Sequence, residues 1–313
     1  MTSLQQVDDD DDFWSVALNG RDAHYLSIQD DEDDFDVTSC EIIERTIATS
    51  APDTSSDSRS LVLRIGQNNK DGCLSDVSGD LWDASLLLAS FLYGTNEGRQ
   101  LCYNACFGTA SAEVDGGGIL ELGSGLGLSG MAAAAAATAE LHAEDVDDEQ
   151  LTSRVVLTDL DDKEILSLLS KNVECNLSEI GDYCETLSVT VQPCDWFNVS
   201  NSRLNADNSC QPRCPTGTFN LIVGSALIYI PDHAIACAET VYHYLSDSKT
   251  SQAVIIQLPD RAGFDQFLCH CRELNLLVSS RAITEDIIMG VERRIVSAKD
   301  YRIYFIRKPQ NVC

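Results

Sequence analysis

From residue 116 onward, short apolar runs alternate with longer segments whose apolar residues recur at helical spacing. The runs typical of strands are 118–122, 154–158, 187–192, 219–224, 253–258, 283–289 and 301–307. The segments typical of helices are 128–142, 161–176, 232–246 and 263–275. This alternation predicts an α/β fold with a doubly wound, Rossmann-like sheet of seven strands. The last two strands lack a convincing helix between them, so we expect an antiparallel strand at one edge of the sheet.

The preceding part of the chain follows a different pattern. Two runs rich in β-branched and apolar residues, 37–47 and 61–67, flank a stretch of Ser, Asp and Pro, which predicts a β-hairpin with a long loop. Residues 80–92 carry apolar side chains at helical spacing, with Asp80 and Asp83 near the start, so a helix is expected to begin there. We therefore expect an N-terminal β-hairpin ahead of the sheet.

Charge separates the first 36 residues from the rest of the chain. They hold 12 acidic side chains and one basic side chain, while the whole chain of 313 residues has a net charge of −29. A segment of this composition buries too little apolar surface to fold. We predict three regions: an acidic, disordered leader over 1–36, the hairpin region over 37–78, and a cofactor-binding α/β domain over 79–313.

The acidic balance also bears on partners. A surface of this sign repels phosphate, which argues against nucleic acids and anionic membranes and favours a protein partner with a basic surface. Acidic residues also serve solubility. No stretch approaches the roughly 20 apolar residues that cross a bilayer, and residues 1–12 lack the features of a secretory signal. We expect a monomer in the cytoplasm or the nucleus.

Thirteen cysteines are numerous for a chain of this kind. Neither Cys102 with Cys106 nor Cys210 with Cys214 has the C-x2-C spacing usual in structural zinc sites. We expect reduced thiols, most of them buried, and no bound metal.

A glycine-rich loop follows the first predicted strand of the sheet. Glu121 lies near the end of that strand, and Gly123, Gly125 and Gly127 alternate through the loop before an alanine-rich helix. Glycines let the backbone turn sharply and let a ligand approach where a Cβ would collide. One register, with Gly130 as third glycine, fits a dinucleotide. The other register, led by Glu121, suits S-adenosylmethionine, because an acid favours its cationic ammonium and sulfonium groups and would repel a pyrophosphate.

The next two strands also end in acids. Asp159 follows the strand at 154–158, where a carboxylate can accept hydrogen bonds from both hydroxyls of a ribose in either cofactor. Asp195 and Trp196 follow the strand at 187–192, where the carboxylate can accept from an adenine amino group and the ring can pack on the base. A single acid at a strand end is usually a turn or cap residue. Three acids after successive strands indicate a shared binding site.

With these segments the chain resembles the class I seven-strand methyltransferases, specifically the group that methylates lysine, and in one branch histidine, on non-histone proteins. The resemblance covers about residues 61–308 and is carried by LVLRIGQ, GDLWDAS, ILELGSGLGLSG, LTDLDD, Asn172 to Asn176, CDW and VGSALIY. It implies S-adenosylmethionine as the cofactor of the 79–313 domain and a protein as substrate. By position it implies that the methionine and ribose portions contact Trp82, Glu121, Gly123, Gly125 and Gly127, that the ribose contacts Asp159, and that the adenine end contacts Asp195 and Trp196.

One position departs from the family's pattern. The family's fourth strand ends in an acid and a tyrosine, as Asp-x-x-Tyr, or with Glu in the histidine branch. This chain has Ala226 in place of the acid and retains Tyr229, which the resemblance makes the catalytic residue. Either Asp232 or Ser225 substitutes for the acid, or the substrate is not lysine, or the protein catalyses little. His233 is a further candidate base in the same segment.

The sequence therefore predicts an S-adenosylmethionine-dependent methyltransferase that acts on a protein side chain, with lysine as the expected target. The alternative is a methyltransferase-fold protein with little or no activity that binds a basic partner. No P-loop, GxSxG or HExxH motif is present, which counts against NTPases, serine hydrolases and zinc proteases.

Overall fold

The computed structural model describes residues 41–48, 60–67, 81–108, 117–143, 153–180, 187–204, 215, 217–291, 295 and 297–310. The predicted leader over 1–36 lies outside these residues, so its disorder stays a prediction. The described residues belong to one unit, Val37–Cys313. None of the helices in this described part is long and apolar enough to cross a bilayer.

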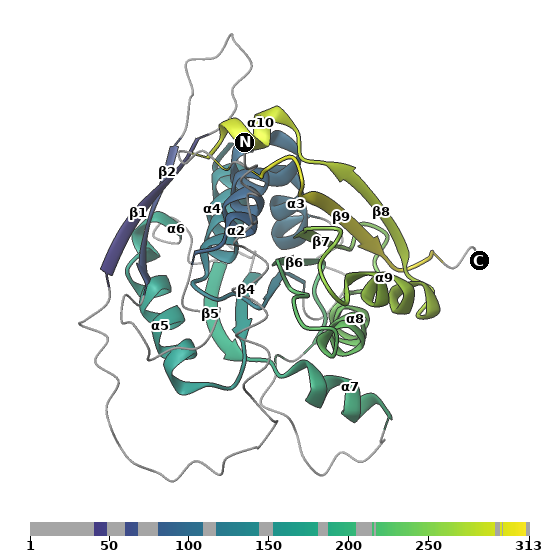
Figure 1. The fold of residues 1–313 in the computed structure, drawn as a ribbon. Coiled ribbons are helices and arrows are strands. Elements are labelled where there is room, and N and C mark those ends of the chain that lie inside the picture. Colours follow the sequence, from purple (N-terminus) through teal and green to yellow (C-terminus); the bar gives the residue numbers. More distant parts are fainter. Residues whose placement is uncertain are drawn as a thin grey trace, which may run out of the picture. The chain divides into compact units, whose positions relative to one another are not determined.

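Seven strands form one mixed sheet in the order β5-β4-β3-β6-β7-β9-β8 (Figure 1). They are β3 (Ile119–Leu122), β4 (Ser153–Asp159), β5 (Leu187–Pro193), β6 (Leu221–Ser225), β7 (Gln252–Gln257), β8 (Leu277–Ala282) and β9 (Arg302–Arg307). β3 to β7 run parallel, and β9 pairs antiparallel with both β7 and β8. The predicted seven-strand α/β sheet is confirmed, and its antiparallel strand lies beside the edge strand β8.

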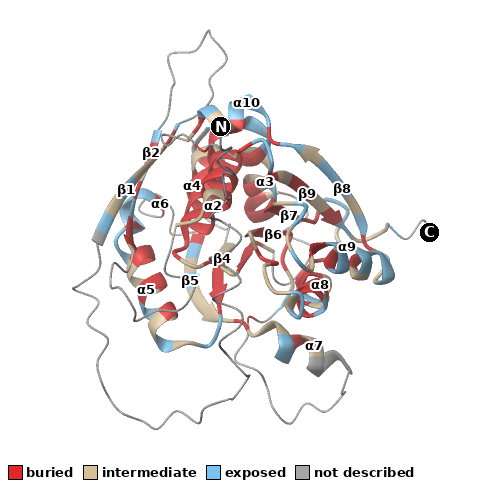
Figure 2. Ribbon diagram, in the orientation of Figure 1, coloured by how far each residue is buried: buried red, intermediate tan, exposed pale blue. Residues whose placement is uncertain are grey.

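Helices cover both faces of the sheet, as strands apolar on both sides require. The helices of the described residues are α2 (Asp83–Ala89), the π-helix η3 (Ser90–Gly94), α3 (Asn96–Phe107), α4 (Leu128–Ala143), α5 (Lys163–Glu174), α6 (Leu177–Ile180), α7 (Trp196–Leu204), α8 (His233–Tyr244), α9 (Phe264–Glu273) and α10 (Glu285–Met289). Ile119 of β3 packs in the core with α2, α3 and α4, whereas the next residue, Leu120, packs in the core with α8 and α9. Figure 2 shows α4 buried along most of its length, which its alanines permit by letting neighbouring helices approach closely.

One predicted strand, 283–289, is wrong, because most of this segment forms α10. Within α10, Ile287 is buried and Ile288 packs against the core, whereas Ile283 is buried just before the helix begins. Glu285 and Asp286 occupy the first turn, where acids favour a helix. The edge strand β8 was missed because most of its side chains are exposed and its sequence is correspondingly polar.

The sequence pattern also missed α3, which follows α2 through η3. Thr95 caps this helix, because its Oγ1 accepts a hydrogen bond from Gly98 N at 3.0 Å. A Cβ on Gly98 would collide with the carbonyl oxygen of Phe91, so only glycine fits there. The helix was not predicted because its sequence is polar and lacks a clear apolar face. One of its charged side chains is directed into the protein rather than into solvent.

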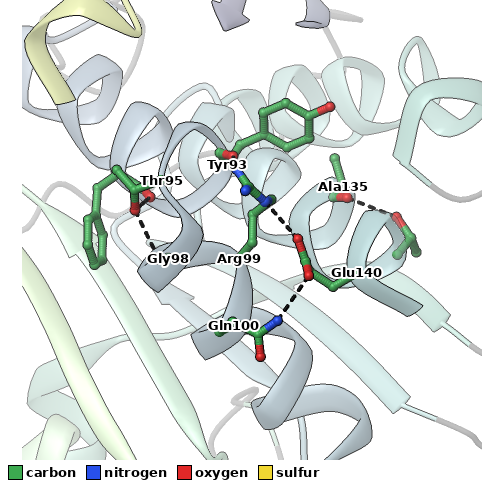
Figure 3. Close-up of polar contacts among 9 residues, drawn as sticks. Tyr93, Thr95, Gly98, Arg99, Gln100, Ala135 and Glu140 are labelled. Carbon is green, nitrogen blue, oxygen red and sulfur yellow. Dashed lines mark hydrogen bonds and ion pairs between the residues drawn. The ribbon is translucent and has the colours of Figure 1, made fainter. Parts of the chain in front are cut away.

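That side chain is Arg99, which joins α3 to α4 (Figure 3). Its Nε lies 2.7 Å from Glu140 Oε1, and it also donates to the carbonyl oxygen of Tyr93 at 2.9 Å. Gln100 Nε2 donates to the other carboxylate oxygen of Glu140 at 2.9 Å. Both charged side chains are mostly buried. Removing one of them would leave the other charge poorly solvated.

Glu140→Ala is therefore expected to lower the free energy of unfolding by about 2 kcal/mol, since Arg99 and Gln100 lose a shared acceptor. Urea unfolding followed by circular dichroism measures the change. Glu97→Ala is the matched control, because it removes an exposed ion pair between α3 and Arg281 and should cost less than about 1 kcal/mol. Equal losses for the two variants would contradict the role given to the buried pair.

β1 (Glu41–Ala48) and β2 (Ser60–Gln67) form the predicted antiparallel hairpin. Two buried asparagines attach it to the sheet domain. Asn172 of α5 accepts from Gly66 N at 2.7 Å and donates to Gly66 O at 3.1 Å. Asn176 makes the same pair of bonds with Arg64, each at 2.7 Å. The hairpin is thus fixed to α5 through its backbone, in addition to the side chains that it buries in the core, Ile47, Leu61, Leu63 and Ile65.

Candidate functional site

The parallel strands β3, β4, β5 and β6 place their carboxyl ends at one edge of the sheet. Four of the positions singled out in the sequence belong to this edge: Glu121 in β3, Asp159 at the end of β4, Asp195 just after β5 and Ala226 just after β6. Open α/β sheets bind their ligands at this edge. The structure therefore gathers the predicted residues into one region.

The loop after β3 depends on its glycines. Gly123, Gly125 and Gly127 have φ angles of 58°, 51° and 84°, in the left-handed region that favours glycine. A Cβ on Gly123 would lie 3.1 Å from Leu227 Cδ2 and 3.5 Å from Trp196 Cζ2. The first glycine thus also brings the loop against the indole ring of Trp196.

Asp159 holds this loop in place. Its Oδ2 accepts a hydrogen bond from Gly125 N at 2.7 Å, and its Oδ1 accepts from Leu160 N at 2.8 Å. Thr158 N donates to Ser124 Oγ at 2.9 Å, and Ser124 N donates to Thr158 O at 2.8 Å. Sequence reasoning did not single out this pair of hydroxyl residues, which ties the glycine loop to the end of β4.

Glu121 is buried below the loop, with 2% of its surface exposed. Desolvation raises the pKa of its carboxyl from 4.5 to about 8; the nearby Asp159 adds to the rise, and hydrogen bonds from Ser124, Gly130 and Ser129 oppose it. Its Oε2 has no hydrogen-bond partner among the described residues. A buried acid with a free oxygen is suited to a cationic or hydrogen-bond-donating ligand.

Glu121→Gln is expected to flatten the pH dependence of stability. Because the pKa of Glu121 is about 8 in the folded protein and 4.5 ordinarily, its contribution to stability is complete below pH 4.5 and is lost as the pH rises through 8. Glutamine stays neutral, so the variant should lose less stability than the parent over this range. Thermal unfolding at a series of pH values measures the difference, and parallel curves for the two proteins would contradict it.

Asp195 and Trp196 lie at the start of α7. Asp195 caps the helix, because its Oδ1 accepts from Phe197 N and its Oδ2 from Asn198 Nδ2, both at 2.9 Å. The indole of Trp196 meets the glycine loop on one side and the ring of His233 on another, with ring centroids 5.9 Å apart. Asp195 thus has a local structural role, whatever ligand contacts it also makes.

Trp82 lies directly before α2 and is half-buried. Its carbonyl oxygen accepts from Ser85 N at 3.0 Å and from Ser85 Oγ at 2.7 Å. The carbonyl oxygen of Ser85 accepts in turn from Ser129 Oγ at 3.4 Å, in the first turn of α4. These contacts link the start of α2 to the helix that follows the glycine loop.

The segment after β6 has a left-handed residue that is not glycine. Ala226 has a φ of 50°, and its N donates to Ile256 O at 2.9 Å. Gln257, buried at the end of β7, donates to Ile228 O at 3.0 Å and accepts from Ile228 N at 3.2 Å. These bonds fix the backbone directly before Tyr229. Sequence reasoning missed Gln257, although a glutamine at the end of an apolar strand was the available signal.

The cysteines do not form a site in the described part of the chain. Cys102 and Cys106 are both buried, and burial raises the pKa of the Cys102 thiol, which makes it unreactive. The described residues contain no group of three or more side chains that could hold a metal ion. Cys210 and Cys214 lie outside the described residues.

Comparisons with known proteins bear on the same segments. The sequence profile of the lysine methyltransferase family matches residues 57–268, about two thirds of the chain. A search of curated proteins found no match. Among solved structures the chain is similar to a methyltransferase from Pyrococcus furiosus (15% identity, 78% of this chain and 90% of that chain covered, TM-score 0.37). It is also similar to the mitomycin 7-O-methyltransferase MmcR (11% identity, 68% of this chain and 54% of that chain covered, TM-score 0.38). A third similar structure is that of LepI in complex with SAM (14% identity, 64% of this chain and 45% of that chain covered, TM-score 0.36).

Proposed function

The chain belongs to the lysine methyltransferase family, and from this premise we propose that it methylates lysine on a protein with a basic surface. Membership of the family gives the reaction, S-adenosylmethionine as methyl donor and a protein as substrate. The basic character of that substrate is inferred from the net charge of −29, which attracts cationic partners.

The observation that supports the cofactor site best is the pair of buried carboxyl groups at the glycine loop. Glu121 lies below the loop with a free Oε2, and Asp159 binds the loop through Gly125 N. A cationic ligand would lower the raised pKa of Glu121 and pair with its carboxylate, whereas a pyrophosphate would not, which argues against the dinucleotide register. Gly123, Gly125 and Gly127 give the loop the left-handed turns that glycine adopts without strain. These features fit S-adenosylmethionine.

We assign the cofactor's parts by position along this edge. Its methionine and ribose portions are assigned to Trp82, Glu121, Gly123, Gly125 and Gly127, its ribose hydroxyls to Asp159, and its adenine end to Asp195 and Trp196. When bound, the cofactor supplies a methyl carbon made electrophilic by a positively charged sulfur. The contact between Trp196 and Gly123 supports one continuous site.

Tyr229 is the proposed catalytic residue. Methyl transfer requires a neutral amine about 3 Å from the methyl carbon and in line with the breaking bond, so positioning supplies most of the rate. A tyrosine hydroxyl can accept a hydrogen bond from such an amine or donate one to it. Gln257 fixes the peptide of Ile228 directly before Tyr229, which limits the positions that the ring can take.

Tyr229→Phe is expected to lower turnover about tenfold and to leave the affinity for S-adenosylmethionine unchanged, because it removes one hydrogen bond to the reacting amine and keeps the ring. Initial rates of methyl transfer and calorimetric titration separate the two effects. A variant as active as the parent would remove Tyr229 from the mechanism.

The proposed function is tested with the purified protein and methyl-labelled S-adenosylmethionine. Calorimetry should show saturable binding of this cofactor and none of NAD. Incubation with a cell lysate should then transfer label to a basic protein, with the label on lysine after hydrolysis. Binding of NAD instead, or label found on no protein, would contradict the proposal.

A further inference from the structure

In the segment after β6, Ala226 occupies the position of the acid in the family's pattern. The ionisable side chains from Ser225 to His233 are those of Tyr229, Asp232 and His233. Asp232 is exposed, whereas His233 is half-buried among aromatic rings. Of these groups, imidazole is the one whose ordinary pKa lets it exchange a proton near neutral pH.

We propose that His233 acts as the base of this site, where Ala226 provides none, and accepts a proton from the lysine ammonium of the substrate. This inference rests on the proposed function, because it concerns the same amine and the same site. The two side chains would then have separate roles: His233 deprotonates the lysine amine, and Tyr229 positions it.

The geometry places His233 within the site. A turn in which His233 N donates to Ile230 O at 3.1 Å leads from Tyr229 into α8. The imidazole meets three rings at their edges, with centroid distances of 5.6 Å to Tyr229, 5.9 Å to Trp196 and 5.5 Å to Phe197. Trp196 also contacts the glycine loop. One continuous layer of rings therefore joins the proposed cofactor loop, the imidazole and the catalytic tyrosine.

The hydrogen bonding of His233 differs from that of a structural histidine. His270 has both ring nitrogens engaged, with Nδ1 2.8 Å from Glu273 Oε2 and Nε2 2.9 Å from Glu239 Oε1. The Nδ1 of His233 is buried and has no hydrogen-bond partner among the described residues. Buried polar atoms are normally paired, so an unpaired ring nitrogen remains available for a proton or a hydrogen bond.

The charge state of His233 suits a base. Desolvation lowers the pKa of the imidazole, and the negative charges of Asp232 on its own segment and Asp195 before α7 oppose this effect without reversing it. The ring is therefore neutral near pH 7 and carries a lone pair. The two acids stabilise the imidazolium once a proton has been transferred.

His233 is a neutral imidazole at the start and at the end of the reaction. The ammonium of lysine transfers one proton to a ring nitrogen of His233, which leaves a neutral amine and an imidazolium. The amine's lone pair forms the new N–C bond to the methyl group as the C–S bond breaks and its electron pair stays on sulfur. The imidazolium then loses its proton to solvent, and the enzyme returns to its starting state.

His233→Phe tests the proposal, because phenylalanine keeps the ring contacts and removes both nitrogens. Methyl transfer to lysate protein should fall about a hundredfold, the usual contribution of a general base, with unchanged affinity for S-adenosylmethionine. His243→Asn, in the last turn of the same helix, is the matched control and should keep full activity. Full activity of His233→Phe would overturn the proposal, whereas an inactive parent protein would instead contradict the proposed function.

A rescue experiment separates a base from a packing residue. Ala226→Asp restores the carboxylate at a left-handed position, which aspartate tolerates better than most residues. In the His233→Phe background this substitution should recover most of the lost rate. Failure to recover any of it would overturn the proposal that His233 serves as the base of the site.

An NMR titration without cofactor tests the same proposal. The signal of His233 should titrate below pH 6.5 and shift on addition of poly-L-lysine. A midpoint above 6.5 or no shift would also count against it.

Discussion

Replacing Asp159 with alanine is expected to weaken the binding of S-adenosylmethionine about a hundredfold, which corresponds to the loss of about 3 kcal/mol from charge-assisted hydrogen bonds. The carboxylate is buried at the end of β4, where each of its oxygens already accepts one backbone hydrogen bond. A carboxylate oxygen has two lone pairs, so a carboxylate that accepts backbone hydrogen bonds can also accept from the hydroxyls of a ribose. Alanine removes this acceptor and also releases Gly125 N from the loop.

The loss of affinity has two causes, the loss of an acceptor for the ribose and the release of the glycine loop. A second variant separates them. Asp159→Asn keeps an oxygen for one of the two backbone bonds, so it should retain more affinity than alanine. Glu174→Ala, an exposed acid near the end of α5, is the control for a general loss of negative charge. Calorimetric titration measures all three proteins. Equal affinities for Asp159→Ala and the parent would remove Asp159 from the cofactor site.

The sequence could predict the sheet and the glycine loop because both depend on local patterns. Apolar runs mark the parallel strands, and the left-handed turn after β3 requires glycine at Gly123, Gly125 and Gly127. β8 was not predictable in the same way, because an edge strand carries polar residues. The segment of α10 was predicted as a strand because isoleucine and methionine in so short a segment fit either an amphipathic helix or a strand.

The site shows the same division between local and tertiary information. The position of Asp159 at a strand end is visible in the sequence, but its bond to Gly125, 34 residues away, is not. Gln257 hydrogen-bonds to Ile228, 29 residues away in sequence, and neither segment has a pattern that predicts this contact. The free Nδ1 of His233 likewise depends on what surrounds the ring, which only the fold determines.

Asn172→Ala is expected to lower the free energy of unfolding by about 3 kcal/mol, because buried backbone groups would lose their partners. The side chain of Asn172 is 2% exposed and joins α5 to β2 across 106 residues of sequence through Gly66 N and Gly66 O. Its Nδ2 also donates to Leu126 O at 3.1 Å, within the glycine loop. The variant should therefore bind S-adenosylmethionine more weakly as well as unfold more easily.

Urea unfolding and calorimetric titration of the same preparations test both effects. Asn104→Ala, at an exposed position of α3, is the matched control and should unfold like the parent protein. Asn172→Asp distinguishes donation from acceptance, because a carboxylate can still accept from Gly66 N but faces the carbonyl oxygens of Gly66 and Leu126 with lone pairs only. It should lose at least as much stability as alanine at neutral pH. A stable aspartate variant would show that the two donated bonds do not hold the hairpin and the glycine loop together.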